Sequence, residues 1–254
     1  MSDPSSPPDP DLAKLARAIE AVESAAPGDE PVVAVPTDWS AIDHCLGGGL
    51  VRSALHEWIG HAGRPLCLLS HLARCAWQQR QGYLVWIGRS CWPHPWSLAD
   101  VPERLDDCLW VNPADPAARD AAGELALRSK CVTAVILDGT GTDLAATRRM
   151  QLAAEAGRAL ALVARPAGPD TASSCVTRWT VSPAPNDDYR PSWQVQLTRC
   201  RGRQLAAGGS LNSPGADPTP WSLTWNPDAG TVDFSARLAD RPGQAATSTR
   251  RQSA

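Results

Sequence analysis

The sequence lacks the features that would place the protein in or beyond a membrane. No stretch reaches the roughly 20 apolar residues that a spanning helix needs. The first ten residues are polar and proline-rich, without the basic start and apolar run of a secretory signal. The eight cysteines include no Cys-x-x-Cys pair, so we expect buried free thiols and no zinc site. These absences predict a cytoplasmic protein with no metal.

Charge and most aromatic residue types are also scarce. Charged residues make up 20% of the chain, and the formal net charge is −3, with a pI near 5.9. This balance excludes a strongly basic nucleic-acid-binding surface and leaves room only for a local basic patch. Tyrosine occurs 2 times and phenylalanine once, against 11 tryptophans. We expect most of these tryptophans in the core, with a minority available for stacking or partner binding.

Composition divides the chain into three parts. Residues 1–34 read as a polar tail, an amphipathic helix over 11–25 and a Pro/Gly-containing linker. Residues 35–236 carry the apolar segments of one domain. Residues 237–254 are polar, and we expect them to be disordered.

Within the domain, apolar strands alternate with helices. Expected strands at 54–59, 83–87, 109–111, 132–137 and 159–164 alternate with expected helices, among them 65–81, 115–129 and 144–156. Strands that read as unbroken apolar runs are buried on both faces, which predicts a mostly parallel sheet flanked by helices. Four β-rich segments follow residue 166 without a helix between them, which favours antiparallel C-terminal strands. The fold class is α/β.

A further short helix is expected from Ser40, with Asp43 at capping-box spacing. The glycines at 47–49 should end it.

The strand–turn–helix at 54–81 has the outline of a phosphate-binding loop without its chemistry. That loop needs Gly-x-x-x-x-Gly-Lys-Ser/Thr, whose lysine neutralises phosphates and whose hydroxyl ligates Mg²⁺. Counted from Gly60, the last three positions read Pro-Leu-Cys, and a shortened loop would place Gly63, Arg64 and Pro65 there. We interpret Gly60, Gly63, Arg64 and Pro65 as a vestigial phosphate-binding loop, where Arg64 can still contact an anion. The alternative is a structural turn that binds nothing.

Two other requirements of ATP hydrolysis are weak or missing. Asp138 follows the apolar strand 132–137, where a Walker-B carboxylate would hold Mg²⁺ through water. The alternative is an ordinary strand-end aspartate that caps the following turn. The strand 83–87 should end at an acid that activates water, but it is followed by Gly88-Arg89-Ser90. We therefore expect no catalytic residue and no cofactor, with ATP binding as the alternative.

The densest basic region of the C-terminal half lies around 178–203. Arginines can contact the phosphates of single-stranded DNA, and tryptophans can stack on its bases. The alternative is a solvated strand edge whose positive charges deter aggregation. The candidate residues for DNA or partner contact are Arg178, Trp179, Trp193, Arg199, Arg201 and Arg203.

The order of motifs resembles the RecA core at residues 37–50, 55–60 (Leu-His-Glu-Trp-Ile-Gly) and 133–138. A closer resemblance is to the ImuA family, RecA-like proteins encoded with translesion-synthesis genes. Its signatures are Val-Pro-Thr at 35–37 leading to Ala-Ile-Asp at 41–43, and the segments 148–155, 177–181 and 191–202. The resemblance covers about residues 35–235 and rests on the order of the motifs.

The resemblance implies a RecA-like fold and a non-catalytic accessory role in SOS-induced translesion DNA synthesis. The implied partners are an ImuB-type polymerase-like protein and an error-prone DNA polymerase, with RecA, the sliding clamp and single-stranded DNA as further candidates. One alternative is a RecA-type ATPase or recombinase with an atypical loop, although the missing lysine argues against it. A second is a regulatory protein such as a SulA-like cell-division inhibitor.

Overall fold

The computed structural model describes residues 33–61, 65–93, 105–168, 171–185, 190–201 and 220–237. The chain divides into two units, Met1–Val32 and Val33–Ala254, and every described residue belongs to the second. The predicted helix 11–25 and the tail from residue 238 lie outside the described residues. The domain boundaries at 34 and 237 therefore remain predictions.

Strands and helices follow one another along the described chain much as the apolar pattern predicts. Their bounds are β1 Ala34–Val35, α2 Ser40–Leu46, β2 Leu50–Val51, β3 Leu55–Gly60, α3 Leu66–Gln79, β4 Tyr83–Ile87, β5 Cys108–Val111, α4 Pro116–Arg128, β6 Val132–Asp138, α5 Leu144–Gly157, β7 Leu160–Pro166, β8 Thr177–Pro183, β9 Ser192–Cys200, β10 Trp221–Asn226 and β11 Thr231–Arg237.

The central feature is a nine-stranded sheet in the order β11-β10-β9-β8-β3-β7-β6-β4-β5. The run from β8 to β5 pairs in parallel, and β9, β10 and β11 pair antiparallel. The predicted α/β fold, with a mostly parallel sheet and antiparallel C-terminal strands, is confirmed. The change of direction falls between β8 and β9, so β8 belongs to the parallel part of the sheet.

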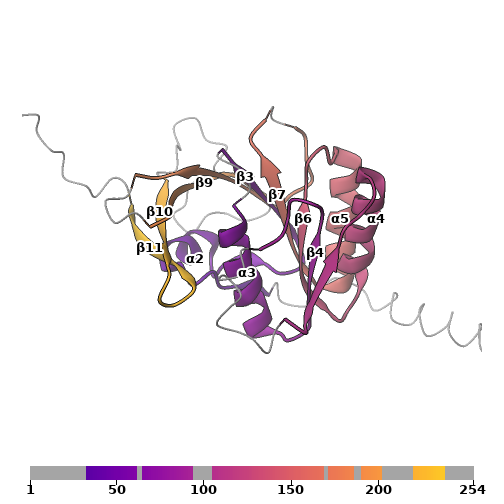
Figure 1. The fold of residues 1–254 in the computed structure, drawn as a ribbon, viewed down its shortest axis with the longest axis horizontal. Coiled ribbons are helices and arrows are strands. Elements are labelled where there is room, and N and C mark those ends of the chain that lie inside the picture. Colours follow the sequence, from indigo (N-terminus) through magenta and orange to yellow (C-terminus); the bar gives the residue numbers. More distant parts are fainter. Residues whose placement is uncertain are drawn as a thin grey trace, which may run out of the picture. The chain divides into compact units, whose positions relative to one another are not determined.

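Helices cover the two faces of the sheet (Figure 1). On one face α2 and α3 pack over a large apolar cluster that includes Trp58, Leu69 and Trp179. On the other face α4 and α5 enclose a second cluster around Leu55, Val135 and Met150. Every residue of β6 is buried, as expected for a central strand that carries apolar side chains to both faces.

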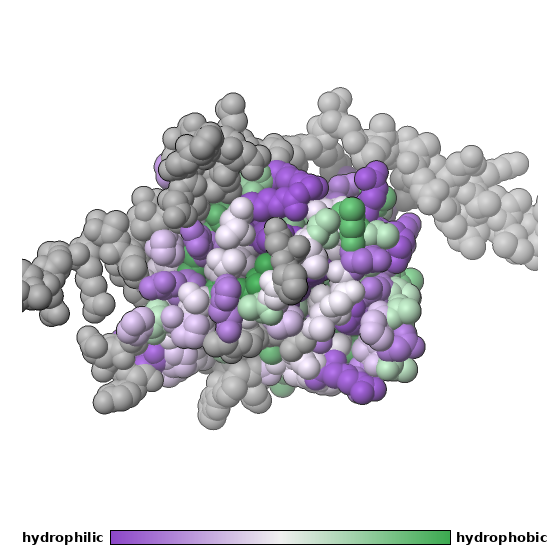
Figure 2. All heavy atoms as spheres, turned by 90° about the horizontal axis from the view of Figure 1, so that it is seen from above, coloured by the Kyte–Doolittle hydropathy of each residue, from purple (hydrophilic) through white to green (hydrophobic). Residues whose placement is uncertain are grey.

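The surface of the described residues is mixed. On the face drawn in Figure 2, hydrophobic residues (green) form small patches among hydrophilic ones (purple). No helix among the described residues is both long enough and apolar enough to span a membrane.

The start of α2 differs from the predicted capping box. The N-cap is Trp39, which makes no side-chain cap hydrogen bond. Asp43 Oδ1 instead accepts hydrogen bonds from Thr37, 2.8 Å from its backbone nitrogen and 2.8 Å from Oγ1. The carboxylate therefore fixes the chain entering the helix, because the turn at 37–39 brings Thr37 within its reach. Gly47 ends α2 in the left-handed conformation, with φ 68°, as the glycine run predicted.

A buried polar chain joins β3 to β8 beneath α2 and α3. His56 Nε2 lies 2.9 Å from the carbonyl oxygen of Val51, which can only accept, so this nitrogen carries the proton. Nδ1 then accepts from the Thr177 hydroxyl at 2.7 Å, which in turn accepts from Trp179 Nε1 at 2.7 Å. Both ring nitrogens are satisfied by a neutral imidazole. Burial lowers the pKa of His56 to about 4.

This chain predicts a loss of stability in mild acid. The unfolded chain takes up a proton on His56 as the pH falls through 6.5, and the folded chain resists protonation until about pH 4. The free energy of unfolding should fall by about 2–3 kcal/mol between pH 7 and pH 4.5 through this group alone. Urea unfolding across this range should show that His56→Gln has a shallower decline than the wild type. His44→Gln, at an exposed position, should follow the wild type. Equal slopes in all three proteins would contradict the assignment.

Candidate functional site

The strand and the helix predicted on either side of the loop after Gly60 are present. β3 ends at Gly60, Pro65 is the N-cap of α3, and the helix begins at Leu66. Gly63 and Arg64 lie outside the described residues, so contact of Arg64 with an anion remains a prediction. After the turn, the first hydroxyl in α3 is that of Ser70. It donates to the Leu66 carbonyl oxygen at 2.8 Å, within its own helix.

Asp138 lies at the carboxyl end of β6, as predicted. Its Oδ1 accepts from the Thr140 backbone nitrogen at 3.0 Å and from Thr140 Oγ1 at 2.7 Å. This is the geometry of an aspartate that caps its own turn, the alternative to a Walker-B role. Gly88, where the sequence offers no carboxylate, lies against it. A Cβ added to Gly88 would approach the Asp138 Cβ to 2.5 Å, so the end of β4 is packed directly on this side chain.

Two buried arginines hold the turn that follows Asp138. Arg119 on α4 donates to the Thr140 carbonyl oxygen at 2.7 Å and to Thr142 Oγ1 at 2.9 Å. Arg165, at the end of β7, donates to the Thr142 carbonyl oxygen at 2.6 Å. Gly139 lies against Val163 and Arg165, with no room for a Cβ. The turn is thus fixed by contacts from both α4 and β7.

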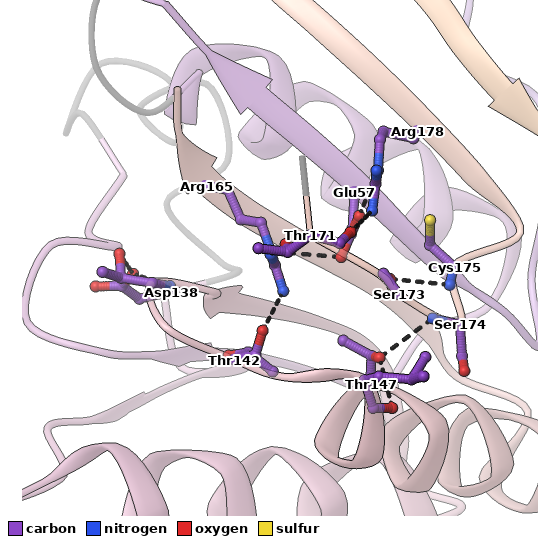
Figure 3. A network of polar contacts seen from close by, with 12 residues as sticks. Glu57, Asp138, Thr142, Thr147, Arg165, Thr171, Ser173, Ser174, Cys175 and Arg178 are labelled. Carbon is purple, nitrogen blue, oxygen red and sulfur yellow. Dashed lines mark hydrogen bonds and ion pairs between the residues drawn. The ribbon is translucent and has the colours of Figure 1, made fainter. Parts of the chain in front are cut away.

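Arg165 also belongs to a buried charge cluster with Glu57 and Arg178 (Figure 3). Glu57 on β3 is fully buried. Its Oε2 lies 2.9 Å from Arg178 Nε, and its Oε1 lies 3.3 Å from Arg165 Nε. The first contact is an aligned hydrogen bond, whereas the second is an ion pair without hydrogen-bond alignment.

The segment between β7 and β8 closes over this cluster. Thr171 accepts twice, through Oγ1 from Arg165 at 2.6 Å and through its carbonyl oxygen from Arg178 at 2.7 Å. Farther along, the Ser174 backbone nitrogen donates to Thr147 Oγ1 on α5 at 3.2 Å (Figure 3). Both guanidinium groups therefore also donate to hydroxyl or carbonyl oxygens of the same chain.

The structure separates the predicted basic contact residues into two groups. Arg178 is 7% exposed and Trp179 is fully buried, with the Trp179 ring stacked on Trp58 at 5.0 Å. These two candidates for DNA or partner contact are therefore buried, held inside by Glu57 and by the tryptophan core. Trp193 is half-buried and packs against the core.

The other basic candidates lie on or near the end of β9. Arg199 is half-buried and donates to the Ser173 carbonyl oxygen at 3.1 Å, while Arg201 is exposed. Arg203 lies outside the described residues. Of the predicted contact residues that the structure describes, only Arg201 is exposed.

Three potential metal ligands also converge away from this region. One donor atom from each of Asp38, His71 and Cys75 lies within 4.8 Å of the other two. The prediction of no metal site used spacing along the chain, which does not reveal this convergence.

Comparison with known proteins gives a relationship along most of the chain. No family model matches it. Two curated proteins named Protein ImuA, from Caulobacter vibrioides strains NA1000 / CB15N and ATCC 19089 / CIP 103742 / CB 15, are each 29% identical over 238 residues. The alignment covers 83% of this chain and 92% of each relative. This similarity supports an assignment to the ImuA family. The resemblance found in the motif order is thereby confirmed.

The sequence pattern located the loop and Asp138, but it did not reveal the roles of Glu57, Arg119 and Arg165. Glu57 and Arg165 carried a usable signal, because each is a charge within an otherwise apolar strand. A charged side chain in such a strand is rarely buried unless it is paired. The identity of the partners, however, depends on strand order and register, which place Glu57 beside Arg178.

The buried cluster predicts a strong asymmetry between two glutamates. Glu57 pairs with two buried arginines, and Glu124 pairs with the more exposed Arg128 and Arg149. Glu57→Ala should lower the free energy of unfolding by about 3–5 kcal/mol, because it leaves buried guanidinium charges unpaired. Glu124→Ala should cost about 1 kcal/mol or less, because solvent screens its pairs. Urea unfolding of both variants measures the difference. Comparable losses would show that the Glu57 cluster is not a buried charge site.

Proposed function

We propose that this chain is a non-catalytic, RecA-like accessory protein in SOS-induced translesion DNA synthesis and DNA repair, and that it acts by binding polymerase components. The observation that carries the proposal is the similarity to Protein ImuA over 83% of this chain and 92% of each relative. The family links the chain to the ImuA/ImuB mutagenesis system. An ImuB-type polymerase-like protein and an error-prone DNA polymerase are the proposed partners.

The absence of catalysis is proposed from the residues themselves. Residues 60–69 include no lysine and no hydroxyl side chain. β4 is followed by Gly88 where an acid would activate water, and Asp138 caps its own turn. A hydrolytic site needs a phosphate-neutralising cation, a Mg²⁺ ligand and a group that orients water. Each of these is weak or missing, which favours binding over turnover.

Partner contact is proposed for the exposed surface. The charged residues Glu57, Arg165 and Arg178 are buried and pair with one another, so a partner cannot reach them. Arg190 and Arg201 are exposed near β9. At the β5 edge of the sheet, Trp92 and Trp110 are 46% and 38% exposed, and their ring centroids lie 5.4 Å apart in a stacked arrangement. Exposed tryptophan and arginine side chains are enriched at the energetic centres of protein interfaces. These two regions are the first places to map a polymerase contact.

Complementation of a deletion strain separates the accessory role from the ATPase alternative. Deletion should reduce mutagenesis after DNA damage, and the wild-type gene should restore it. Asp138→Asn keeps an oxygen that can cap the Thr140 turn but removes the charge that Mg²⁺ would need. This variant should restore mutagenesis to the wild-type level, scored as damage-induced mutation frequency at matched protein abundance.

The controls make both outcomes informative. Glu57→Ala should fail to complement because less folded protein accumulates, which an immunoblot will show. A stable, abundant Asp138→Asn protein that fails to complement would favour the ATPase alternative. Undiminished mutagenesis in the deletion strain would remove the role in lesion bypass and favour the SulA-like alternative.

A further inference from the structure

Three donor atoms of different chemistry meet on the α2–α3 side of the sheet, away from the region of Asp138. Cys75 Sγ lies 3.4 Å from Asp38 Oδ2 and 3.6 Å from His71 Nε2. His71 and Cys75 are four residues apart on α3, so they lie one turn apart on the same helix face. Asp38 comes from the turn that precedes α2. The cluster therefore joins two segments more than 30 residues apart in the sequence.

The two distances from Cys75 Sγ fit a tetrahedral ion, and the donor atoms of Asp38 and His71 lie within 4.8 Å of each other. Zinc bonds of about 2.3 Å to sulfur and about 2.0 Å to nitrogen place those two ligands about 3.6 Å apart at a tetrahedral angle. The sulfur–oxygen separation expected from the same bond lengths is about 3.6 Å. The distances around Cys75 match these values to within about 0.2 Å. A thiolate, an imidazole and a carboxylate also form a donor set that suits zinc.

The surrounding residues hold the side chains of His71 and Cys75 in place and leave Asp38 accessible to solvent. The His71 ring stacks on Trp39 with centroids 4.9 Å apart, and both His71 and Cys75 are buried. His71 Nε2 donates to the Thr37 carbonyl oxygen at 2.8 Å and Nδ1 accepts from Arg74 Nη2 at 3.3 Å, so the ring is neutral, as a metal ligand must be. Asp38 is exposed and holds a left-handed backbone with φ 62°. An ion can thus enter from the solvent side, past Asp38, toward the buried sulfur and nitrogen.

We propose that Asp38 Oδ2, His71 Nε2 and Cys75 Sγ bind a zinc ion, with the Thr37 carbonyl oxygen or a water molecule as the fourth ligand. The Thr37 oxygen is 2.8 Å from His71 Nε2, on the side of the ring that faces the cluster. The thiolate and the carboxylate together balance the two positive charges of the ion. The site clips the start of α2 to α3, and it does not depend on the proposed role in lesion bypass.

Binding requires a defined movement of protons. Without the ion, the Cys75 thiol donates to Asp38 and the protonated His71 Nε2 donates to Thr37. With zinc bound, the thiol proton leaves to solvent and the imidazole proton moves from Nε2 to Nδ1. Arg74 Nη2, now 3.3 Å from Nδ1, must then turn away. The hydrogen-bonded cluster is complete by itself, so the chain folds without zinc and is stabilised further by it.

The test uses the purified full chain, stripped with a chelator, reloaded with zinc and passed through gel filtration. Elemental analysis should find about one zinc per chain in the wild type. At a hundredfold excess of free zinc over its dissociation constant, the Tm should rise by roughly 5–10 °C. Cobalt loading should give thiolate-to-cobalt charge-transfer absorption, which reports the sulfur ligand directly.

The variants separate a ligand from a structural residue. Cys75→Ser should lose the bound zinc and the charge-transfer band, while Cys67→Ser, a change on the same helix outside the cluster, should keep both. Asp38→Gly removes the carboxylate but relieves the left-handed backbone. It should therefore fold with an undiminished zinc-free Tm and lose the zinc-dependent rise. No zinc in the wild type, an equal zinc content in Cys75→Ser, or a full Tm rise in Asp38→Gly would overturn the proposal.

Discussion

The carboxylate of Glu57 is buried in the middle of the sheet. Much of the surrounding structure either neutralises its negative charge or bonds to the arginines that do so. The two carboxylate oxygens face Arg178 on β8 and Arg165 on β7, so one charge joins three adjacent parallel strands. Each arginine then uses its remaining donors on the segment at Thr171 or on the turn at Thr142. An unpaired buried charge costs several kcal/mol. The side chain of Glu57 thus couples the strand order, the segment at Thr171 and the turn after Asp138.

This coupling bears on what the α/β fold does in this chain. The turn after Asp138 is held by Arg119 and Arg165, and the aspartate itself caps that turn. These polar groups maintain the architecture of the sheet end, and residues 61–67 include neither the lysine nor the hydroxyl side chain of a nucleotide site. A fold can keep its surfaces while its ligand site changes, so function is argued from the site and not from the fold. The proposed accessory role rests on that reasoning together with the similarity to Protein ImuA.

The sequence predicted the fold better than the side-chain environments. Unbroken apolar runs such as 132–137 identified buried parallel strands, and Gly47 identified the end of α2, because local pattern and backbone conformation determine these features. Arg178 and Trp179 were candidates for DNA or partner contact because basic and aromatic residues cluster there in the sequence, yet strand register places both in the core. The convergence of Asp38, His71 and Cys75 was invisible for the same reason. Contacts between distant segments depend on topology, which spacing along the chain does not encode.

The central claim is that this protein works by binding polymerase components without turning over ATP. Its most direct test is affinity purification of the tagged full chain from DNA-damaged cells, followed by mass spectrometry. The account predicts that the ImuB-type protein and the error-prone polymerase are recovered at equal levels with the wild type and with Asp138→Asn, with or without ATP in the buffer. Failure to recover any polymerase component, or recovery that requires ATP and Asp138, would contradict it.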